Sequence, residues 1–268
     1  MRSVTGPNSN WIVREFATAY STILKARGFH HVYIDAFAGA GLHLSKVSGE
    51  FVPGSPLNAL LVNPPFKEFF FIDLDSQKTA QLKQLVGDRD DVHIYSGDCN
   101  DVLLLEVFPQ VRYADFRRGL CLLDPYGVHL SWEVIARAGA MQTIDLFLNF
   151  PIMDMNRNFL WRTPEKVDSS GINRMSAFWG DDSWRGVAYT PQQTLFEIKQ
   201  VKEENLVIVE AFRQRIREVA GFPHVARALP MRNSRGAVVY FLLFASQKQV
   251  AENIVDDIFS KYEKRGMR

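Results

Sequence analysis

Short apolar runs alternate with amphipathic segments over residues 1–150 of the chain. Runs rich in β-branched and aromatic side chains predict buried strands, and apolar positions repeated at helical spacing predict helices. The predicted strands are residues 31–34, 69–75, 92–95, 119–123 and 143–150. The predicted helices are residues 10–27, 54–62, 76–86, 101–107 and 132–138, with Ser55, Ser76 and Ser131 as N-caps. Strands and helices that alternate in this way form a parallel sheet with right-handed crossovers.

The alternation stops after residue 150. Residues 43–53 already form a long polar loop, residues 151–190 are irregular, and residues 191–220 are mostly helical. Two strands at 225–232 and 237–245, joined by a turn at 233–236, and a helix at 247–264 complete the chain. This order resembles the seven-stranded, mostly parallel sheet of Rossmann-like class I methyltransferases, with its antiparallel C-terminal hairpin. We expect an α/β fold in three parts: residues 1–150 as the cofactor-binding half, residues 151–204 as an aromatic and helical insertion after the fifth strand, and residues 205–268 as the completion of the core.

Acidic residues follow four of the predicted strands: Asp35, Asp73, Asp98 and Asp124. In a doubly wound sheet, ligands bind beyond the carboxyl ends of the strands, so these side chains are expected on one rim. After the first of them comes a small-residue loop with Gly39 and Gly41, where the backbone can take positive φ and approach a ligand closely. Four acids in succession are poorly explained as solubilising loop residues, and they favour a ligand site.

The first two acids suit the charged and sugar parts of a nucleoside cofactor. Asp35 is expected near an ammonium group, and Phe37 belongs to the same loop. Asp73 can accept from both ribose hydroxyls because a carboxylate has two acceptor oxygens. Leu74 follows it directly, and Asp75 is the alternative ribose ligand.

The third acid suits the base of the same cofactor. Asp98 can accept from an adenine amino group, and the backbone N–H of Cys99 can contact a ring nitrogen. The glycine loop lacks the third small residue of a dinucleotide-binding fingerprint, because Leu44 takes that place. The cofactor is therefore expected to be S-adenosyl-L-methionine, and a nicotinamide-dependent dehydrogenase is the weaker alternative.

The fourth acid opens a turn that resembles a catalytic motif. Asp124, Pro125 and Tyr126 are similar to the (Asp/Asn)-Pro-Pro-(Tyr/Phe) motif of methyltransferases that act on exocyclic amino groups of bases. In that motif the acid or amide and the following carbonyl accept from the amine, which positions it for transfer, and the aromatic ring stacks on a flipped base. The second proline is missing here, and Gly127 follows the tyrosine, so a plain strand-end turn is the competing interpretation.

The insertion at 151–204 interleaves aromatic residues with arginines. Stacking rings and nearby cations hold single-stranded or flipped nucleic acid. The candidate substrate residues are Trp161, Arg174, Trp179 and Trp184. At least half of the aromatic residues in this region are expected to be core of the insertion instead.

Composition and charge narrow the range of possible domain organisations, ligands and cellular locations. The chain has 268 residues, a net charge of +1 and 47% hydrophobic residues, which fits one large core. Seven bases and one acid fall between residues 211 and 250, which hints at an anionic ligand there. Cys99 and Cys121 lie in or beside apolar runs, which favours reduced thiols in a cytoplasmic protein. The histidines show no metal-ligand spacing, and no apolar run predicts a membrane span.

Six segments together resemble one family, the three-Cys-motif partner proteins (TcmP). They are IDAFAGAG, GSPLNAL, FFFIDLD, SGDCND, LLDPYG and LFLNFP, within about residues 10–245. The resemblance implies a class I methyltransferase-like fold, a cofactor site at Asp35, Gly39, Gly41, Asp73 and Asp98, and a catalytic turn at Asp124–Tyr126. It also implies dependence on a partner protein with three cysteines, of radical-enzyme type.

Two functions stay open at this point. The first is an S-adenosylmethionine-dependent methyltransferase that acts on an amino group of a nucleic acid base. The second is a non-catalytic or cofactor-gated partner of the three-cysteine protein, which the incomplete motif at Asp124 favours.

Overall fold

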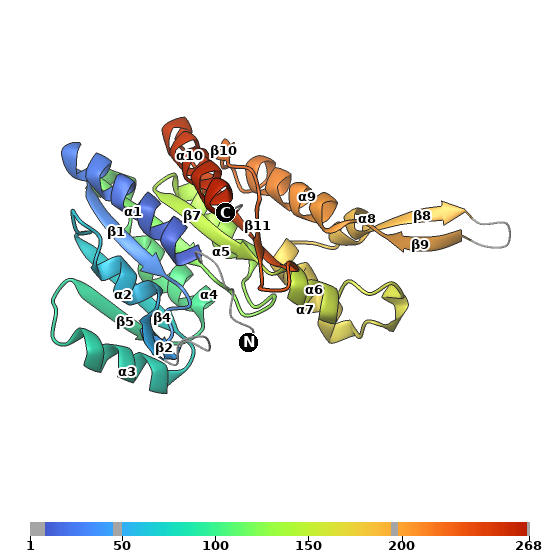
Figure 1. The fold of residues 1–268 in the computed structure, drawn as a ribbon, viewed down its shortest axis with the longest axis horizontal. Coiled ribbons are helices and arrows are strands. Elements are labelled where there is room, and N and C mark those ends of the chain that lie inside the picture. The colour runs from blue at the N-terminus through green and yellow to red at the C-terminus, as the bar shows by residue number, and fades with distance from the viewer. Residues whose placement is uncertain (1–8, 45–49, 194–197, 267–268) are drawn as a thin grey trace.

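The structure, a computed structural model, describes residues 9–44, 50–193 and 198–266. An eight-stranded, mostly parallel sheet forms its centre (Figure 1). Strand β1 (His30–Asp35) pairs in parallel with β4 (Glu68–Asp73) on one side and with β6 (Arg117–Leu123) on the other. Beyond these, β5 (Val92–Ser96) pairs with β4, and β7 (Ile144–Phe150) pairs with β6. The five strands predicted in the first half of the chain are therefore confirmed as parallel neighbours.

The last long strand runs in the opposite direction. Strand β12 (Val238–Ser246) is antiparallel to β7. On the other edge of β12, β10 (His224–Val225) and β11 (Leu229–Arg232) lie one after the other, and both are antiparallel to it. They fill the place of the one strand predicted at 225–232, so the sheet has seven positions. This order confirms the predicted α/β, Rossmann-like class I methyltransferase fold.

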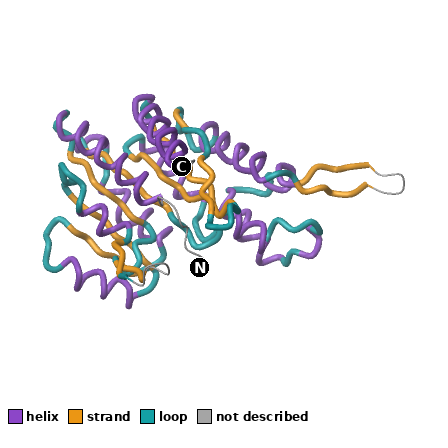
Figure 2. The backbone as a smooth tube through the Cα atoms, viewed as in Figure 1, coloured by secondary structure: helices purple, strands orange, loops and turns teal. Residues whose placement is uncertain are grey.

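Helices cover both faces of the sheet, as the smooth trace in Figure 2 shows. One face packs against α1 (Ser9–Ala26), α2 (Ser55–Leu60), α3 (Ser76–Val86) and α10 (Gln249–Gly266). The other packs against α5 (Trp132–Met141), α9 (Asn205–Glu218) and the π-helix Val102–Val107 that continues α4 (Cys99–Asp101). Along β1, Tyr33 faces the first group of helices, whereas Val32 and Ile34 face the second. Strands buried on both faces explain why they are continuous apolar runs in the sequence.

Three local predictions in the first half were wrong in detail. Gly54, not Ser55, is the N-cap of α2, and Ser55 is its first residue. Asp75, not Ser76, caps α3, because its carboxylate accepts from the N–H groups of Gln77 and Lys78. The loop predicted at 43–53 begins and ends in a two-stranded ladder of β2 (Leu42–Leu44) and β3 (Phe51–Pro53), and residues 45–49 lie outside the described residues.

The insertion is more regular than its sequence indicated. The region predicted to be irregular contains α6 (Ile152–Asn158), α7 (Ser169–Trp179) and α8 (Trp184–Ala188). The region predicted to be mostly helical begins with the antiparallel pair β8 (Tyr189–Gln193) and β9 (Ile198–Lys202) before α9 starts. The insertion is thus helical and β-hairpin together, and the hairpin projects far from the body of the protein (Figure 1).

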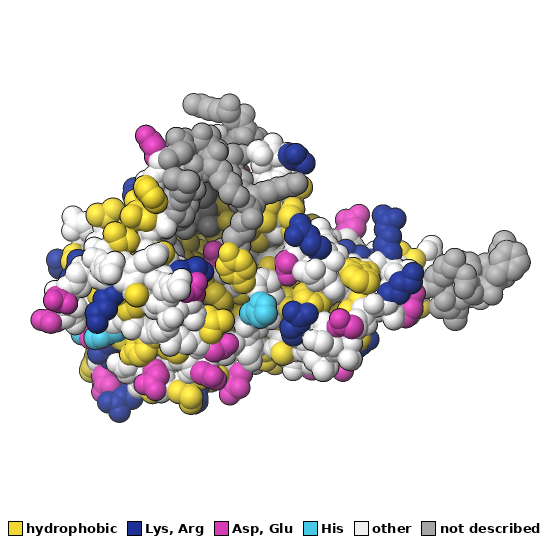
Figure 3. Space-filling view, turned by 90° about the horizontal axis from the view of Figure 1, so that it is seen from below, with side chains coloured by type: hydrophobic (Ala, Val, Ile, Leu, Met, Phe, Trp, Pro, Cys, Tyr) yellow, Lys and Arg dark blue, Asp and Glu magenta, His cyan; other side chains and the backbone are white. Residues whose placement is uncertain are grey.

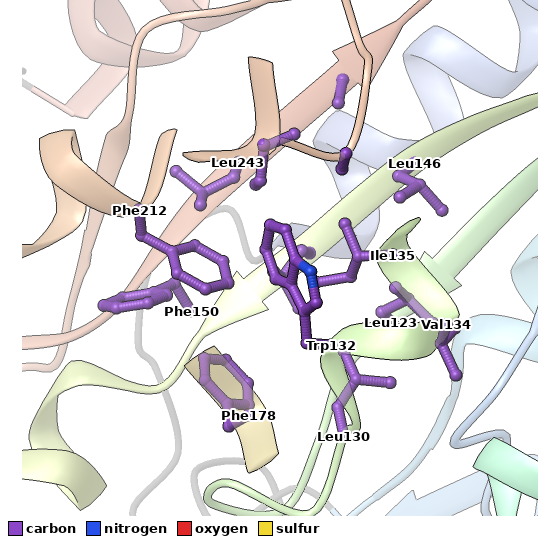
Figure 4. Close-up of a cluster of buried hydrophobic side chains, with 14 of the residues drawn as sticks. Leu123, Leu130, Trp132, Val134, Ile135, Leu146, Phe150, Phe178, Phe212 and Leu243 are labelled. Carbon is purple, nitrogen blue, oxygen red and sulfur yellow. The ribbon is translucent and has the colours of Figure 1, made fainter. Parts of the chain in front are cut away.

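An aromatic cluster anchors the insertion to the sheet (Figure 4). Phe178 of α7 stacks on Phe212 of α9, with ring centroids 5.3 Å apart and planes 17° apart. Phe212 also packs on Phe150 of β7 at 4.9 Å and meets Trp132 of α5 edge-on at 5.7 Å. Such aromatic contacts stabilise the packing beyond the area they bury.

The basic residues near the C-terminus serve the fold. Arg213 donates to the carbonyls of Val225 and Ala226, and Arg215 donates to the carbonyl of Trp179. Arg227 forms a paired set of hydrogen bonds with Glu263. Three of the seven bases between residues 211 and 250 therefore have structural partners within the fold, which weakens the hint of an anionic ligand there. Among the described helices, none has the length and apolar character that a membrane span requires.

Candidate functional site

The loops at the carboxyl ends of β1, β4 and β5 are joined by backbone hydrogen bonds. The N–H of Ala38 donates to the carbonyl of Ile72 at 2.8 Å, and the N–H of Gly97 donates to the carbonyl of Asp73 at 3.1 Å. These contacts bring the glycine loop, the second acid and the third acid to one rim of the sheet. Three of the four acids predicted for this rim therefore lie on loops that contact one another.

Asp73 is the connecting residue of this rim. Its Oδ2 accepts from the N–H of Gly39 at 2.9 Å, and its Oδ1 accepts from the N–H of Asp75 at 2.9 Å. Lys78 lies 3.8 Å from Oδ1. Each carboxylate oxygen has a second lone pair, so acceptor capacity for two hydroxyls is still present. Asp75 is occupied as the cap of α3, which makes it the poorer candidate for the ribose.

The glycine loop needs glycine at both positions. Gly39 has φ of 65° and Gly41 has φ of 81°, a region that other residues rarely adopt. A Cβ on Gly41 would also lie 2.7 Å from Cδ1 of Leu82 on α3. The loop is therefore shaped by backbone conformation and by close packing on α3.

Asp35 is a buried carboxyl group beneath this loop. Its Oδ1 accepts from the N–H of Phe37 at 3.2 Å, and its Oδ2 has no hydrogen-bond partner among the described residues. Burial raises the pKa of Asp35 to about 7, while the nearby Ser55 hydroxyl and the Phe37 N–H oppose that rise. A buried acceptor without a donor is costly, so the group suits a ligand that brings a cation or donor.

Replacing Asp35 with asparagine is expected to stabilise the protein at pH 8. Between pH 3.8 and about pH 7 the folded state holds a proton that the unfolded chain has lost, and above pH 7 the folded state must bury a carboxylate. Stability from this group is complete below pH 3.8, falls as pH rises, and is gone above about pH 7. Urea unfolding should show Asp35→Asn more stable than the wild type by about 1–2 kcal/mol at pH 8, after the cost of the buried amide. The difference should vanish near pH 4, and a pH-independent difference would contradict this assignment.

The third acid shapes the loop after β5. Asp98 caps a short helix, and its Oδ1 accepts from both the backbone and the side-chain nitrogen of Asn100. The Asn100 side chain then bridges to the loop after β6, donating to the carbonyl of His129 and accepting from the N–H of Ser131. The sequence analysis did not identify Asn100. Its side chain nevertheless connects Asp98 to the loop after β6, the strand that precedes Asp124.

The apolar candidates of the rim differ in exposure. Leu74 is 73% exposed although it is a large hydrophobic residue in a well-packed protein. Phe37 is half-buried and packs on the core, and Cys99 is buried, with a thiol whose pKa is raised by burial to about 12. An exposed leucine directly after Asp73 offers an apolar surface for a flat ring.

The turn after β6 holds the fourth acid against β7. Nδ2 of Asn149 donates to Oδ1 of Asp124 at 2.6 Å. Asp124 is exposed as a residue, but protein atoms crowd its carboxyl group, and this desolvation raises its pKa while the Asn149 amide lowers it. Pro125 is buried, whereas Tyr126 is 59% exposed.

Asn149 is a site residue that the sequence reasoning missed. It lies at the end of β7, is only 4% exposed, and its Oδ1 has no partner among the described residues. Leu123 of β6 pairs with Leu148 of β7, so the next residues, Asp124 and Asn149, meet across the two strands. A polar residue at the end of an apolar strand was the signal that could have found it.

The predicted substrate residues separate into two groups. Trp179 and Trp184 are 1% and 3% exposed, and their indole N–H groups donate to Ser183 and Ser176. These two rings belong to the core of the insertion, so we remove them from the substrate site. Trp161 is 38% exposed, and it lines a cavity of about 470 Å³ beside the Asp124 turn together with Arg174 and Tyr126.

Charge is unevenly distributed on the face seen in Figure 3. Acidic side chains gather along the margin away from the projecting hairpin, while lysine and arginine side chains are more frequent toward the hairpin. No group of three or more His, Cys, Asp or Glu side chains that could hold a metal ion occurs within the described ranges.

Comparisons with known proteins support the fold. No protein-family model matches the chain, and no curated protein matches it in sequence. Among solved structures it is similar to the Legionella pneumophila protein LPL1258 of the DUF519 family, with 13% identity and a TM-score of 0.57 over 98% of this chain and 95% of that one. This likeness shows a shared fold.

Other structural neighbours are methyltransferases at low similarity. A Leishmania major SAM-dependent methyltransferase of the DUF858 family has 10% identity and a TM-score of 0.42, covering 88% of this chain and 72% of that one. A Mesorhizobium loti S-adenosylmethionine-dependent methyltransferase has 10% identity and a TM-score of 0.37, covering 85% and 97%.

Proposed function

We propose that this protein is a methyltransferase that uses S-adenosyl-L-methionine and methylates an amino group of a nucleic acid base. The observation that carries the proposal is the rim of four strand-end acids, of which Asp35 is buried with a free acceptor oxygen. Such a rim offers separate acceptors for an ammonium group, a ribose and an adenine within one cofactor.

The residues present fit that cofactor. Asp35 would face its ammonium group, Asp73 its ribose, and Asp98 with the Cys99 N–H its adenine. Leu74 would cover one face of the adenine ring, while Phe37, Gly39 and Gly41 would shape the loop around the amino acid part. When bound, S-adenosylmethionine supplies a methyl group carried on a positively charged sulfur.

The Asp124 turn would hold the substrate amine. A carboxylate fixed by Asn149 can accept a hydrogen bond from an amino group and orient it, and Tyr126 presents an exposed ring on which a base can stack. The amine loses a proton when it is methylated, and a carboxyl with a raised pKa accepts protons more readily. Pro125 fixes the turn between these two side chains.

The proposed division of labour follows the chain. Residues 1–150 would bind the cofactor, residues 151–204 would face the substrate or a partner, and residues 205–268 would complete the core. Two buried cysteines without a disulfide are consistent with a cytoplasmic protein.

A partner role is the second candidate, and the projecting β8–β9 hairpin favours it. Residues Thr190–Gln193 of β8 are exposed and lie away from the acid rim (Figure 1). In this alternative the chain would be a TcmP-like protein that docks a three-cysteine-motif protein and uses the cofactor, if at all, to control docking.

Incubation with S-adenosylmethionine carrying a labelled methyl group tests the proposal. Total cellular RNA, DNA and protein are offered together, and label is expected in a nucleic acid fraction. Label confined to protein would redirect the substrate assignment. Absence of label in all fractions, together with capture of a three-cysteine protein, would favour the partner role.

A further inference from the structure

A cavity of about 470 Å³ lies between the Asp124 turn and the insertion. Its walls come from the turn, at Tyr126 and Gly127, and from α6 and α7 with the segment between them. The two walls touch directly, because a Cβ on Gly127 would lie only 2.5 Å from Oδ2 of Asp154 on α6. The cavity therefore opens beside the position where the proposed function places its substrate amine.

The cavity is lined by two acids that accept hydrogen bonds from the protein and by two cations that form no ion pair within the described residues. Asp154 accepts from the side-chain amide of Asn158 at 2.9 Å, and Asp168 accepts from the N–H of Gly171 as the cap of α7. Lys166 and Arg174 are exposed, and neither forms an ion pair within the described part of the chain. Both acids thus have structural partners, whereas both cations are available to an anionic group.

The Trp161 ring of the cavity is partly exposed but held in place, whereas Phe159 is buried. Trp161 is 38% exposed, and its indole N–H donates to the carbonyl of Arg157 at 2.7 Å. Its own carbonyl accepts from the hydroxyl of Tyr189 at 2.8 Å. The guanidinium of Arg174 lies 5.3 Å from the ring centre of Phe159. A fixed ring beside a fixed cation presents a stacking surface and a phosphate contact with little loss of conformational entropy.

We infer that this cavity binds one nucleotide of a single-stranded nucleic acid, with the base against Trp161 and the phosphate on Arg174 and Lys166. Stacking on an aromatic ring and contact of phosphate with Arg or Lys are the two components of single-strand binding. The inference rests on the proposed function, because that function makes the neighbouring nucleotide the methyl acceptor.

The test is binding of a fluorescent single-stranded RNA of about twelve nucleotides, followed by anisotropy, with the DNA of the same sequence as a second arm. Trp161→Leu is expected to weaken binding by about tenfold, whereas Trp161→Phe, which keeps a ring, should bind within about twofold of the wild type. Arg174→Gln should lower the slope of log affinity against log salt by about 0.7. Arg185→Gln removes the same charge from α8 outside the cavity, and its slope should stay at the wild-type value.

The outcomes separate this inference from the proposed function. Unchanged affinity and salt slope in both Trp161→Leu and Arg174→Gln would overturn the cavity assignment, even if the wild type methylates the oligonucleotide. Failure of the wild type to bind either the RNA or the DNA oligonucleotide would overturn the cavity assignment as well. Loss of binding in both variants without any cofactor binding by the wild type would support the cavity and contradict the methyltransferase proposal. Circular dichroism confirms that each variant is folded. Trp161→Leu removes a ring and Arg174→Gln removes a charge, so the two variants are independent tests of the cavity.

Discussion

Replacing Asp73 with alanine is expected to weaken S-adenosylmethionine binding at least a hundredfold. The substitution removes the proposed acceptor for the ribose hydroxyls and the acceptor for the Gly39 N–H at 2.9 Å. Hydrogen bonds to a charged group contribute about 1.5–3 kcal/mol each, so the loss of two such contacts is enough for that factor. Isothermal titration calorimetry with cofactor and with S-adenosylhomocysteine measures it directly.

Asp75→Ala is the matched control for this prediction. It removes an acid only two positions away, and its effect should fall on the cap of α3. We expect the free energy of unfolding to drop by about 1 kcal/mol and cofactor affinity to stay within about twofold. Equal loss of cofactor binding in both variants would assign the ribose contact to the whole loop and would remove Asp73 as its specific ligand.

The positions of the four rim acids could be predicted because they depend on local pattern and on one general rule. Each acid ends or follows a strand, three of the four strands are largely buried, and parallel strands place their carboxyl ends on the same side. The choice between Asp73 and Asp75 depends on which carboxylate meets the first N–H groups of α3. That is a matter of backbone direction over three residues, and both candidates look alike in sequence.

The contact between Asp124 and Asn149 could not be predicted in the same way. It joins residues that are 25 positions apart and depends on the register of two parallel strands. The order of strands was predictable, but a register shift of one residue would turn the Asn149 side chain to the other face. Polar residues at strand ends are therefore best considered in pairs across neighbouring strands.

The insertion shows why aromatic and arginine content misled the substrate prediction. Met175, Phe178 and Trp179 recur at helical spacing and form the buried face of α7. Glycine and acidic residues in and around this short helix made its helical spacing of apolar residues hard to recognise in the sequence. Trp161 lies between helices, and its ring is left partly exposed for that reason. Burial of each tryptophan depends on tertiary packing that composition does not contain.

Replacing Asp124 with alanine is expected to reduce methyl transfer about a thousandfold and to leave cofactor affinity within about threefold, since positioning of a reacting group can account for a factor of this size. The carboxylate meets the proposed substrate amine and lies on the turn after β6, whereas the proposed cofactor contacts come from the loops after β1, β4 and β5. Single-turnover transfer to a nucleic acid substrate, with calorimetry on the same preparation, separates the two effects. Unchanged transfer would exclude Asp124 from the mechanism.

Asn149→Leu distinguishes a positioned carboxylate from one that is merely present. The Asn149 amide donates to Asp124 and lowers the pKa of that carboxyl, which desolvation by the surrounding protein has raised. Without the donor, the pKa of Asp124 rises further, so a higher pH is needed to form the carboxylate. The acidic limb of the rate profile should therefore move to higher pH, and transfer at neutral pH should fall by about tenfold to a hundredfold. Asn149→Asp places a second carboxyl beside Asp124 and should move the limb in the same direction through like-charge repulsion. A uniform loss of rate at all pH values in both variants would mean that Asn149 supports the fold of the turn and has no influence on the protonation of Asp124.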